Sequence, residues 1–116
     1  MQGNKYRNIK SEYNGVVYDS RKEMRRAATL ELYQRAGAIR GLERQKKFVL
    51  QDKFTDRHGD HIREIAYFAD FYYWDNTGEV WVAEDVKSPA TRQDPVYRIK
   101  KKMFLYKYPE IKFLET

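Results

Sequence analysis

The sequence predicts a mixed α/β domain in the order helix, three strands, helix, strand, with a mixed sheet flanked by helices. Two segments rich in Tyr, Phe, Trp, Val and Ile flank turn residues at 75–78, as expected for a β-hairpin. Two amphipathic segments, after residues 20 and 94, begin with N-cap residues and predict helices. With 116 residues, the chain fits one domain, residues 1–116.

Composition narrows the class of protein. Lys and Arg number 23 against 17 Asp and Glu, a net charge of +6, and 10 tyrosines are present. This balance favours a polyanionic partner, nucleic acid before membrane. The lack of cysteine excludes disulfides and thiol catalysis and fits a reducing compartment. Because no apolar segment has transmembrane length and no secretory signal opens the chain, we expect a soluble, cytoplasmic protein without a membrane partner.

Residues 1–19 predict a basic arm followed by a short hairpin. Asn14-Gly15 is a strong two-residue turn signal between two short apolar segments. Three cations precede it: Lys5, Arg7 and Lys10. Two interpretations stay open, because charges near a chain end either contact phosphates of a nucleic acid or belong to a flexible terminus.

The first helix is predicted to begin at Ser20 and to end at Gly37. Ser20 has N-cap chemistry, and Glu23 three residues later completes a capping box. The expected apolar stripe is Met24, Ala27, Ala28 and Leu32, with Leu30 beside it. Glu23 lies on the inward edge of this stripe. It serves either as a capping partner or as an acid that leans over the sheet, and we favour the second role.

After Gly37 the sequence predicts a loop containing Ile39 and Leu42, then a short strand over residues 46–51. Gln45 is polar and near the predicted site, without an assigned role. Residues 56–61 contain two histidines and two aspartates. We expect a surface loop there rather than a metal site, because one loop rarely supplies a full coordination shell.

The predicted central hairpin runs from Ile65 to Lys87. A turn centred between Asn76 and Thr77 sets Asp70 opposite Ala83 and makes Asp70 a diagonal neighbour of Asp85, about 7–8 Å away. Strict alternation places Asp70, Asp85 and Lys87 on one face and Glu84 on the other. Asp70 interrupts a strand that is apolar on both faces, which indicates a covered central strand. An isolated carboxylate is costly there, so we favour a functional site over a solvated ribbon.

The chain beyond Lys87 predicts a loop at 88–91, then a second helix and a final strand at 111–114. Asp94-Pro95 begins the helix and Tyr108-Pro109 ends it. The residues expected to face the core are Val96, Ile99, Met103 and Tyr106. The cations on the other faces are Arg98, Lys100, Lys101 and Lys102. They form either a ridge that contacts phosphates, which we favour, or a solvated face.

This order of elements, with Glu23 on the first helix, Asp70 in the second core strand and Asp85-Val86-Lys87 in the third, resembles the PD-(D/E)xK nuclease superfamily. The superfamily more often has Glu at the position of Asp85. The spacing of a larger motif set is also similar to a family of small phage proteins described as a domain of unknown function. That set comprises Asn4-Lys5-Tyr6, Tyr18-Asp19-Ser20 with Glu23, Leu42-Glu43-Arg44-Gln45, Tyr67-Phe68-Ala69-Asp70-Phe71 and Glu84-Asp85-Val86-Lys87. Gln93 and Tyr97 match the spacing of a further motif of some relatives, with Pro95 between them.

The resemblance implies a restriction-endonuclease-like core and a Mg²⁺- or Mn²⁺-dependent endodeoxyribonuclease. Asp70, Asp85 and the backbone carbonyl of Val86 become metal ligands, Glu23 serves a second ion or its water, and Lys87 acts as the catalytic cation. The implied activity is cleavage of Holliday junctions or other branched DNA in phage replication and recombination, in the host cytoplasm. Paired cuts imply a homodimer. The predicted DNA contacts are Lys5, Arg7, Lys46, Lys47, Arg98, Lys100, Lys101 and Lys102.

Two other functions stay open. One is a non-catalytic nucleic-acid-binding module on the same fold. The other is a structural phage protein whose basic face binds another protein. The presence of Glu23, Asp70, Asp85 and Lys87 together favours the nuclease, because a binding module has little need of all four.

Overall fold

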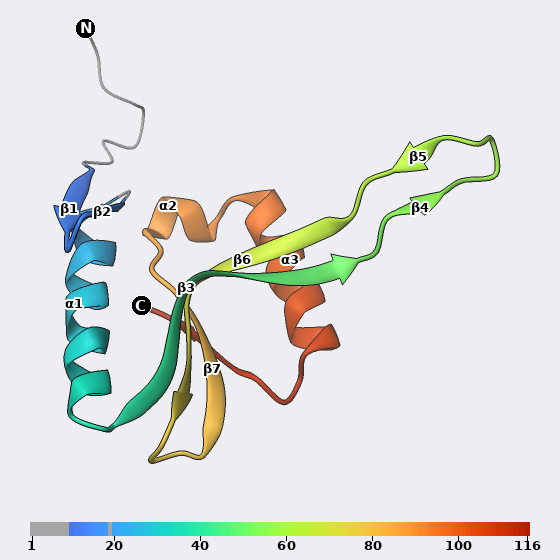
Figure 1. Cartoon of the computed structure of the whole chain (residues 1–116). Helices are drawn as coiled ribbons and strands as arrows, with labels where there is room; N and C mark the ends of the chain where they lie inside the picture. The colour runs from blue at the N-terminus through green and yellow to red at the C-terminus, as the bar shows by residue number, and fades with distance from the viewer. Residues whose placement is uncertain (1–9, 19) are drawn as a thin grey trace, which may run out of the picture.

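A computed structural model of the protein describes residues 10–18 and 20–116, apart from the side chain of Val17. A four-stranded sheet in the order β3-β6-β7-β8 forms the centre, antiparallel except for the parallel pair β7 and β8. The elements (Figure 1) are β1 Ser11–Tyr13, β2 Val16–Tyr18, α1 Arg21–Arg35, β3 Ile39–Gln51, β4 Phe54–Thr55, β5 His61–Ile62, β6 Ile65–Asp75, β7 Val80–Asp85, α2 Pro89–Arg92, α3 Pro95–Lys107 and β8 Lys112–Glu115.

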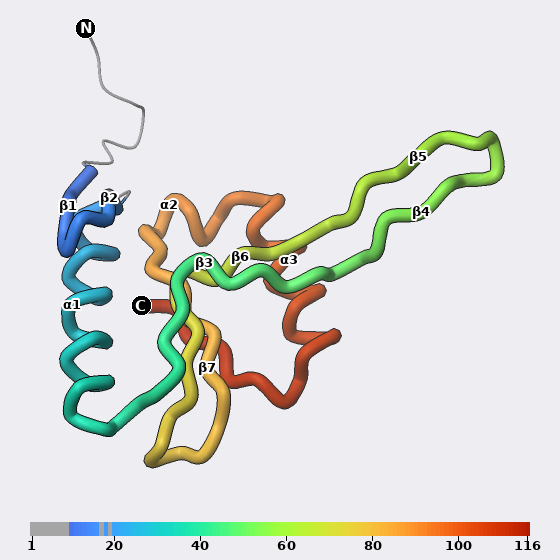
Figure 2. The backbone as a smooth tube through the Cα atoms, viewed as in Figure 1, coloured from blue at the N-terminus to red at the C-terminus, as the bar shows by residue number. Residues whose placement is uncertain are grey.

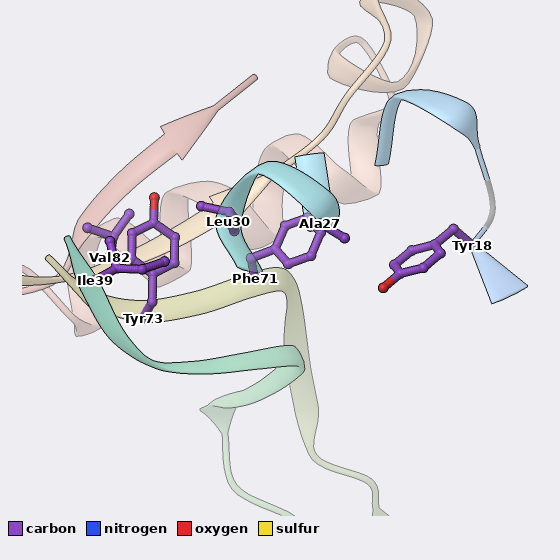
Figure 3. Close-up of a cluster of buried hydrophobic side chains, with 7 residues drawn as sticks. All are labelled: Tyr18, Ala27, Leu30, Ile39, Phe71, Tyr73 and Val82. Atoms are coloured by element: carbon purple, nitrogen blue, oxygen red, sulfur yellow. The ribbon is translucent and has the colours of Figure 1, made fainter. Parts of the chain in front are cut away.

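Helices α1 and α3 pack against the sheet through two separate clusters of buried side chains. The α1-side cluster joins Ala27 and Leu30 to Phe71 of β6 and further residues of the sheet (Figure 3). The α3-side cluster joins Tyr97 and Phe104 to residues of β3, β6 and β7. The predicted mixed α/β class, with a mixed sheet flanked by helices, is confirmed.

Helix α1 begins as predicted, because the Ser20 hydroxyl accepts a hydrogen bond from the backbone N–H of Glu23 at 3.1 Å. Its end is marked by Gly37, whose positive φ of 83° suits glycine. The predicted stripe is wrong in one respect, since Leu32 is exposed. The buried residues are Glu23, Ala27 and Leu30, so the line at i, i+4 and i+7 is the centre of the packed face and not its edge.

Strand β3 is far longer than predicted and includes the expected loop. It pairs with β6 from Ile39 onward, with a register shift between Arg40 and Glu43. Gly41 lies within that shift at φ 68°, against the ring of Trp81. Glycine and polar residues are poor strand signals, and the pairing with β6 overrides them here.

A bend divides the sheet where Gln45 of β3 lies opposite Asp70 of β6. The flanking pairs are Arg44–Phe71 and Lys46–Ala69, and Gln45 itself has a positive φ of 51°. Strand β3 changes direction along its length (Figure 2). The alternation of β6 changes here too, since Tyr67 and Ala69 belong to the α3-side cluster whereas Phe71 and Tyr73 belong to the α1-side cluster. The predicted strict alternation through Asp70 is therefore wrong.

The hairpin of β6 and β7 is confirmed, but its predicted register is wrong by two residues. Tyr72, and not Asp70, lies opposite Ala83, and the last pair is Phe71 with Glu84. The turn is longer than assumed because Asp75 closes it, with its Oδ1 accepting from the Thr77 N–H at 2.9 Å and its carbonyl accepting from the Glu79 N–H at 2.8 Å. One step beyond the last pair, Asp70 and Asp85 lie directly across from each other instead of diagonally.

Beyond the bend, β3 and β6 continue into the small hairpin β4–β5, which projects away from the two helices (Figure 1). In its loop the Asp56 carboxylate accepts from the backbone N–H groups of His58 and Asp60 at 2.8 and 2.9 Å. Asp56 thus closes a surface turn, the role expected of an aspartate in such a loop. At the other end of the chain, β1 and β2 form the predicted hairpin at Asn14-Gly15.

Helix α3 has the predicted bounds, but three of the four residues predicted to face the core do not. Val96, Ile99 and Tyr106 are exposed, whereas Met103 is half-buried and packs against the α3-side cluster. The buried residues of the helix are Tyr97 and Phe104. The large rings of Tyr97 and Phe104 pack into the aromatic α3-side cluster and set the rotation of the helix. The predicted loop at 88–91 is instead mostly the short helix α2, and β8 forms close to its expected place.

Candidate active site

The structure brings the four predicted catalytic residues together. Glu23, Asp70 and Lys87 line one cavity of about 280 Å³, together with Lys22, Val86 and others. Asp85 is fully buried next to them, in contact with both Asp70 and Lys87. The start of helix α1 supplies one wall. The bend of β6 at Asp70 and the segment that follows β7 supply the other.

Asp70 lies at the bend of β6 with its carboxylate held from two sides. The side-chain N–H of Gln45 donates to Oδ1 at 3.1 Å, and the backbone N–H of Val86 donates to Oδ2 at 2.9 Å. Only 8% of the residue is exposed. The two donors fix the carboxylate, and each oxygen keeps a lone pair for a further ligand.

Asp85, the last residue of β7, is also held by two hydrogen bonds. Its Oδ1 accepts from the backbone N–H of Asp70 at 3.1 Å, and its Oδ2 accepts from the hydroxyl of Tyr67. Among the described residues the nearest cation is Lys87, whose Nζ is 4.0 Å from Oδ2. Burial raises the pKa of Asp85 to about 6; the charge of Lys87 opposes this rise and the charge of Asp70 adds to it.

Lys87 is positioned by its backbone and by an aromatic ring. Its N–H donates to the carbonyl of Thr116 at 3.1 Å, and its carbonyl accepts from the amino group of Lys22 at 3.3 Å. Its own amino group lies 5.0 Å from the centroid of the Tyr97 ring. Tyr97 donates its hydroxyl to Glu115, and burial first, then this hydrogen bond, raises the pKa of Tyr97, so the ring stays neutral.

Glu23 contributes its backbone to the helix cap and its carboxylate to the cavity. Its backbone N–H bonds the N-cap Ser20, and its buried carboxylate lines the cavity. That carboxylate pairs with Arg44 Nη2 at 3.2 Å. Arg44 also lies over the ring of Tyr18, 4.2 Å from its centroid.

Sequence reasoning assigned no role to three residues that hold the site: Arg44, Gln45 and Tyr67. Gln45 was placed near the site, but the contacts of Arg44 and Gln45 could not be predicted because the first half of β3 was expected to be a loop. A predicted long β3 paired with β6 would have set Gln45 opposite Asp70. Tyr67 carried no signal, because one tyrosine in an aromatic strand is ordinary core.

The predicted nucleic-acid contacts are dispersed. Lys46, Lys47 and Lys101 each pair with a glutamate, namely Glu43 at 3.7 Å, Glu64, and Glu115 at 3.0 Å. Arg98 and Lys102 are exposed and border a second cavity of about 210 Å³, next to Arg92 and Tyr97. Lys100 is half-buried. Lys5 and Arg7 lie outside the described residues.

The donor set decides whether a divalent cation fits. Asp70 and Asp85 offer carboxylate oxygens across one strand pair, and Val86 adds a backbone carbonyl, which are the oxygen donors that Mg²⁺ and Mn²⁺ prefer. Within residues 10–18 and 20–116, no three Asp, Glu, His or Cys side chains form a ready coordination group. Mg²⁺ usually keeps several waters and needs only one or two carboxylates, so the residues present fit such an ion.

These features define a mixed α/β domain with three buried acids, Glu23, Asp70 and Asp85, and a lysine at or next to one cavity. A comparison with protein families shows that the chain belongs to the family described as "protein of unknown function (DUF1064)", which matches residues 3–115. Comparisons with curated proteins and with solved structures gave no match. None of the described helices is long and apolar enough to cross a membrane.

Proposed function

We propose that this protein is a metal-dependent DNA endonuclease of the PD-(D/E)xK type, built on a restriction-endonuclease-like core. The observation that carries the proposal is the meeting of Asp70, Asp85 and Lys87 at one cavity, with Glu23 on the facing wall. Buried acids beside a cation in a cavity are typical of catalytic sites and costly in a scaffold.

Asp70, Asp85 and the carbonyl of Val86 would hold Mg²⁺ or Mn²⁺, and Glu23 would serve a second ion or its water. When bound, such an ion polarises the scissile phosphate and lowers the pKa of water, which supplies a nucleophile at neutral pH. The chain's own residues prepare this site. Tyr67 and the backbone of Asp70 fix the Asp85 carboxylate, so that little reorganisation is needed for it to accept a ligand.

Lys87 supplies the fixed positive charge. It lies 4.0 Å from Asp85 and is confined by the ring of Tyr97, so its ammonium stays at the cavity. There it neutralises charge that develops on a phosphate during hydrolysis and holds an attacking water in place. Gln45 keeps Asp70 turned toward the same cavity through its 3.1 Å hydrogen bond.

The substrate is DNA in this proposal, and branched DNA in particular. Lys22 lines the active-site cavity, while Arg92, Arg98 and Lys102 border the second cavity on the other side of Tyr97. These cations offer a path for phosphates beside the acids. A domain of this size has little room for a separate sequence-reading module, which favours recognition of DNA shape. Two symmetric cuts at a Holliday junction require two active sites, so the proposed enzyme is a homodimer. It would act in the cytoplasm of the host, where the DNA is.

The test is cleavage of linear, flap and four-way-junction DNA with Mg²⁺, with Mn²⁺ and with chelator. We expect junction or flap DNA to be cut with either metal and left intact with chelator. Asp70→Asn should bind the same DNA without cutting it, whereas Asp52→Asn, which changes an exposed acid outside the cavity lining, should cut normally.

Cleavage undiminished by chelator, or full activity of Asp70→Asn, overturns the metal mechanism. Tight DNA binding without cleavage under any metal condition would favour the non-catalytic nucleic-acid-binding module instead. Binding and cleavage are therefore measured on the same DNA preparations.

A further inference from the structure

Helix α3 presents an apolar stripe to solvent. We call the α3 stripe the residues Val96, Ile99, Met103 and Tyr106. They recur at i, i+3, i+7 and i+10 and therefore lie along one side of the helix. Val96 and Ile99 are each 59% exposed and Tyr106 is 90% exposed. Met103 is half-buried, because it also packs against the α3-side cluster. Tyr97 and Phe104 pack against the sheet on another side of the helix, so Val96, Ile99 and Tyr106 form a second apolar face that remains exposed.

Cations border the α3 stripe on both sides. At 100° per residue, Arg98 and Lys102 follow one edge, while Lys100 and Lys107 follow the other. The helix contains no acid between Pro95 and Lys107. An apolar stripe between two basic edges attracts a surface with the complementary pattern, apolar in the middle and acidic at both margins.

We propose that the α3 stripe is the docking surface for an amphipathic helix of another protein, whose apolar stripe is flanked by Asp and Glu. The 3-4-3 spacing of the stripe is that of positions a and d in a heptad, which pack against a facing helix. The acidic margins of such a helix would pair with Lys100, Lys102 and Lys107. This surface does not depend on the nuclease proposal, since no stripe residue borders the active-site cavity.

Three other occupants fit the stripe less well. The two long helices of a second copy are both cationic, because α3 carries five Lys and Arg without an acid and α1 carries five against two Glu. Apposed, they would repel. DNA offers little to Val96 and Ile99, which have no hydrogen-bond donor for phosphates. A membrane-surface helix buries a broad apolar face with Trp, Phe and Leu, and the α3 stripe is narrow.

The experiment uses the full chain and two synthetic helical peptides with identical Leu positions at a and d. One peptide has Glu at the flanking positions and the other has Lys. Binding is measured by fluorescence anisotropy at low and high salt. The variants are Ile99→Lys on the stripe and Leu32→Lys on α1, a matched control because Leu32 is also exposed, at 55%. Vesicles with and without anionic lipid, and sedimentation of the protein alone, test the membrane and the second copy.

We expect wild type and Leu32→Lys to bind the Glu-flanked peptide at least about tenfold more tightly than the Lys-flanked peptide, with the preference reduced by salt. Ile99→Lys should lose at least about tenfold in affinity for the Glu-flanked peptide, because the variant removes apolar contact area and places a charge against the apolar face of the peptide, where it would lose its hydration. Equal affinity for the two peptides, or no binding of either, overturns the proposal. Anionic-vesicle binding or self-association that Ile99→Lys abolishes, without a peptide preference, assigns the stripe to a membrane or to a second copy.

Discussion

Glu84 and Asp85 are neighbours on β7 and are equally buried, but the negative charges of their carboxylates are compensated differently. Glu84 faces α1, where Arg26 binds it through two nitrogens, Tyr73 donates its hydroxyl at 2.7 Å and Thr116 donates at 3.2 Å. Asp85 faces the other way. Within residues 10–18 and 20–116, its hydrogen-bond donors are the Tyr67 hydroxyl and the backbone N–H of Asp70, and its nearest cation is Lys87, 4.0 Å away. One carboxylate has a bidentate cation in direct contact and the other does not.

The difference separates a structural ion pair from a candidate catalytic acid. A guanidinium in direct contact compensates the charge of Glu84, so that cluster needs nothing further. Asp70 and Asp85 are two acids side by side, the Lys87 ammonium is 4.0 Å from Asp85 without direct contact, and Asp70 borders a cavity. Burial alone does not distinguish the two kinds of acid, since Glu84 and Asp85 are both fully buried. What distinguishes the candidate catalytic acid is that no cation contacts it directly within the described residues and that it lies next to a cavity.

The largest effect is expected where the structural pair is broken. Arg26→Met leaves the Glu84 charge buried without its cation, which should lower the free energy of unfolding by about 3–5 kcal/mol. Urea denaturation at unchanged m-value measures this loss. The double variant Arg26→Met with Glu84→Gln should be more stable than the single one, because the buried charge is gone. If Arg26→Met is as stable as wild type, water must reach the Glu84 carboxylate, and Glu84 then does not differ from Asp85 in its need for a cation.

The second effect is on catalysis. Asp70→Asn should lower the cleavage rate by about 100-fold or more while junction binding and the unfolding midpoint stay close to wild type. The amide keeps the volume of the carboxylate and removes the charge that an ion would need. Asp85→Asn and Lys87→Ala should behave alike in single-turnover cleavage assays. Loss of folding in Asp70→Asn, with activity per folded molecule retained, would move Asp70 to the structural class of Glu84.

A smaller effect on cleavage is expected at Glu23. Like Glu84 it pairs with an arginine, and like Asp70 it lines the cavity. Gln preserves the backbone contact to Ser20 and the side-chain volume, so Glu23→Gln should cost about 1 kcal/mol or less in stability through the weakened pair with Arg44. If Glu23 serves the metals, cleavage should fall about tenfold and the required metal concentration should rise. Cleavage rates that coincide with wild type over the whole metal series would assign this residue to the helix end alone.

The two faces of β7 could be predicted, even though the switch of faces along β6 and the register of the hairpin could not. The turn was placed wrongly because Asp75 closes a longer loop, yet the error was two residues. Side chains in a strand alternate with period two, so such an error leaves Asp85 and Glu84 on their correct faces. It changed only how close Asp70 and Asp85 were expected to be.

The orientation of α3 could not be predicted for a different reason. The helix has two apolar lines with equally good spacing, the α3 stripe and the line of Tyr97 and Phe104. Periodicity shows that a side is apolar and does not show which side meets the sheet. The choice depends on the ring volumes of the α3-side cluster, which include residues from three strands distant in sequence. The bend at Gln45 was likewise invisible, because a positive φ on a glutamine leaves no local sequence signal.

The smallest effect is expected on DNA affinity, from the cations of α3. Among them, too, some are paired with an acid and others are exposed. Lys101 is paired with Glu115 at 3.0 Å and lies over Phe113, so it has less to offer a phosphate than Arg98 and Lys102. Each phosphate neutralised on duplex DNA adds about 0.9 to the slope of log affinity against log salt. Replacing Arg98 and Lys102 together by Gln should therefore flatten that slope by up to about two units.

A salt series on one junction compares this double variant with wild type and with Arg35→Gln plus Lys112→Gln, which removes two exposed cations outside both cavity linings. The control should keep the wild-type slope, and the position of cleavage should stay the same in all three proteins, because phosphate contacts fix affinity and the acids fix where the bond breaks. If the slope of Arg98→Gln with Lys102→Gln coincides with wild type, these cations are a solvated face. The phosphates must then follow Lys22 and Arg92 beside the active-site cavity, or the arm that contains Lys5, Arg7 and Lys10.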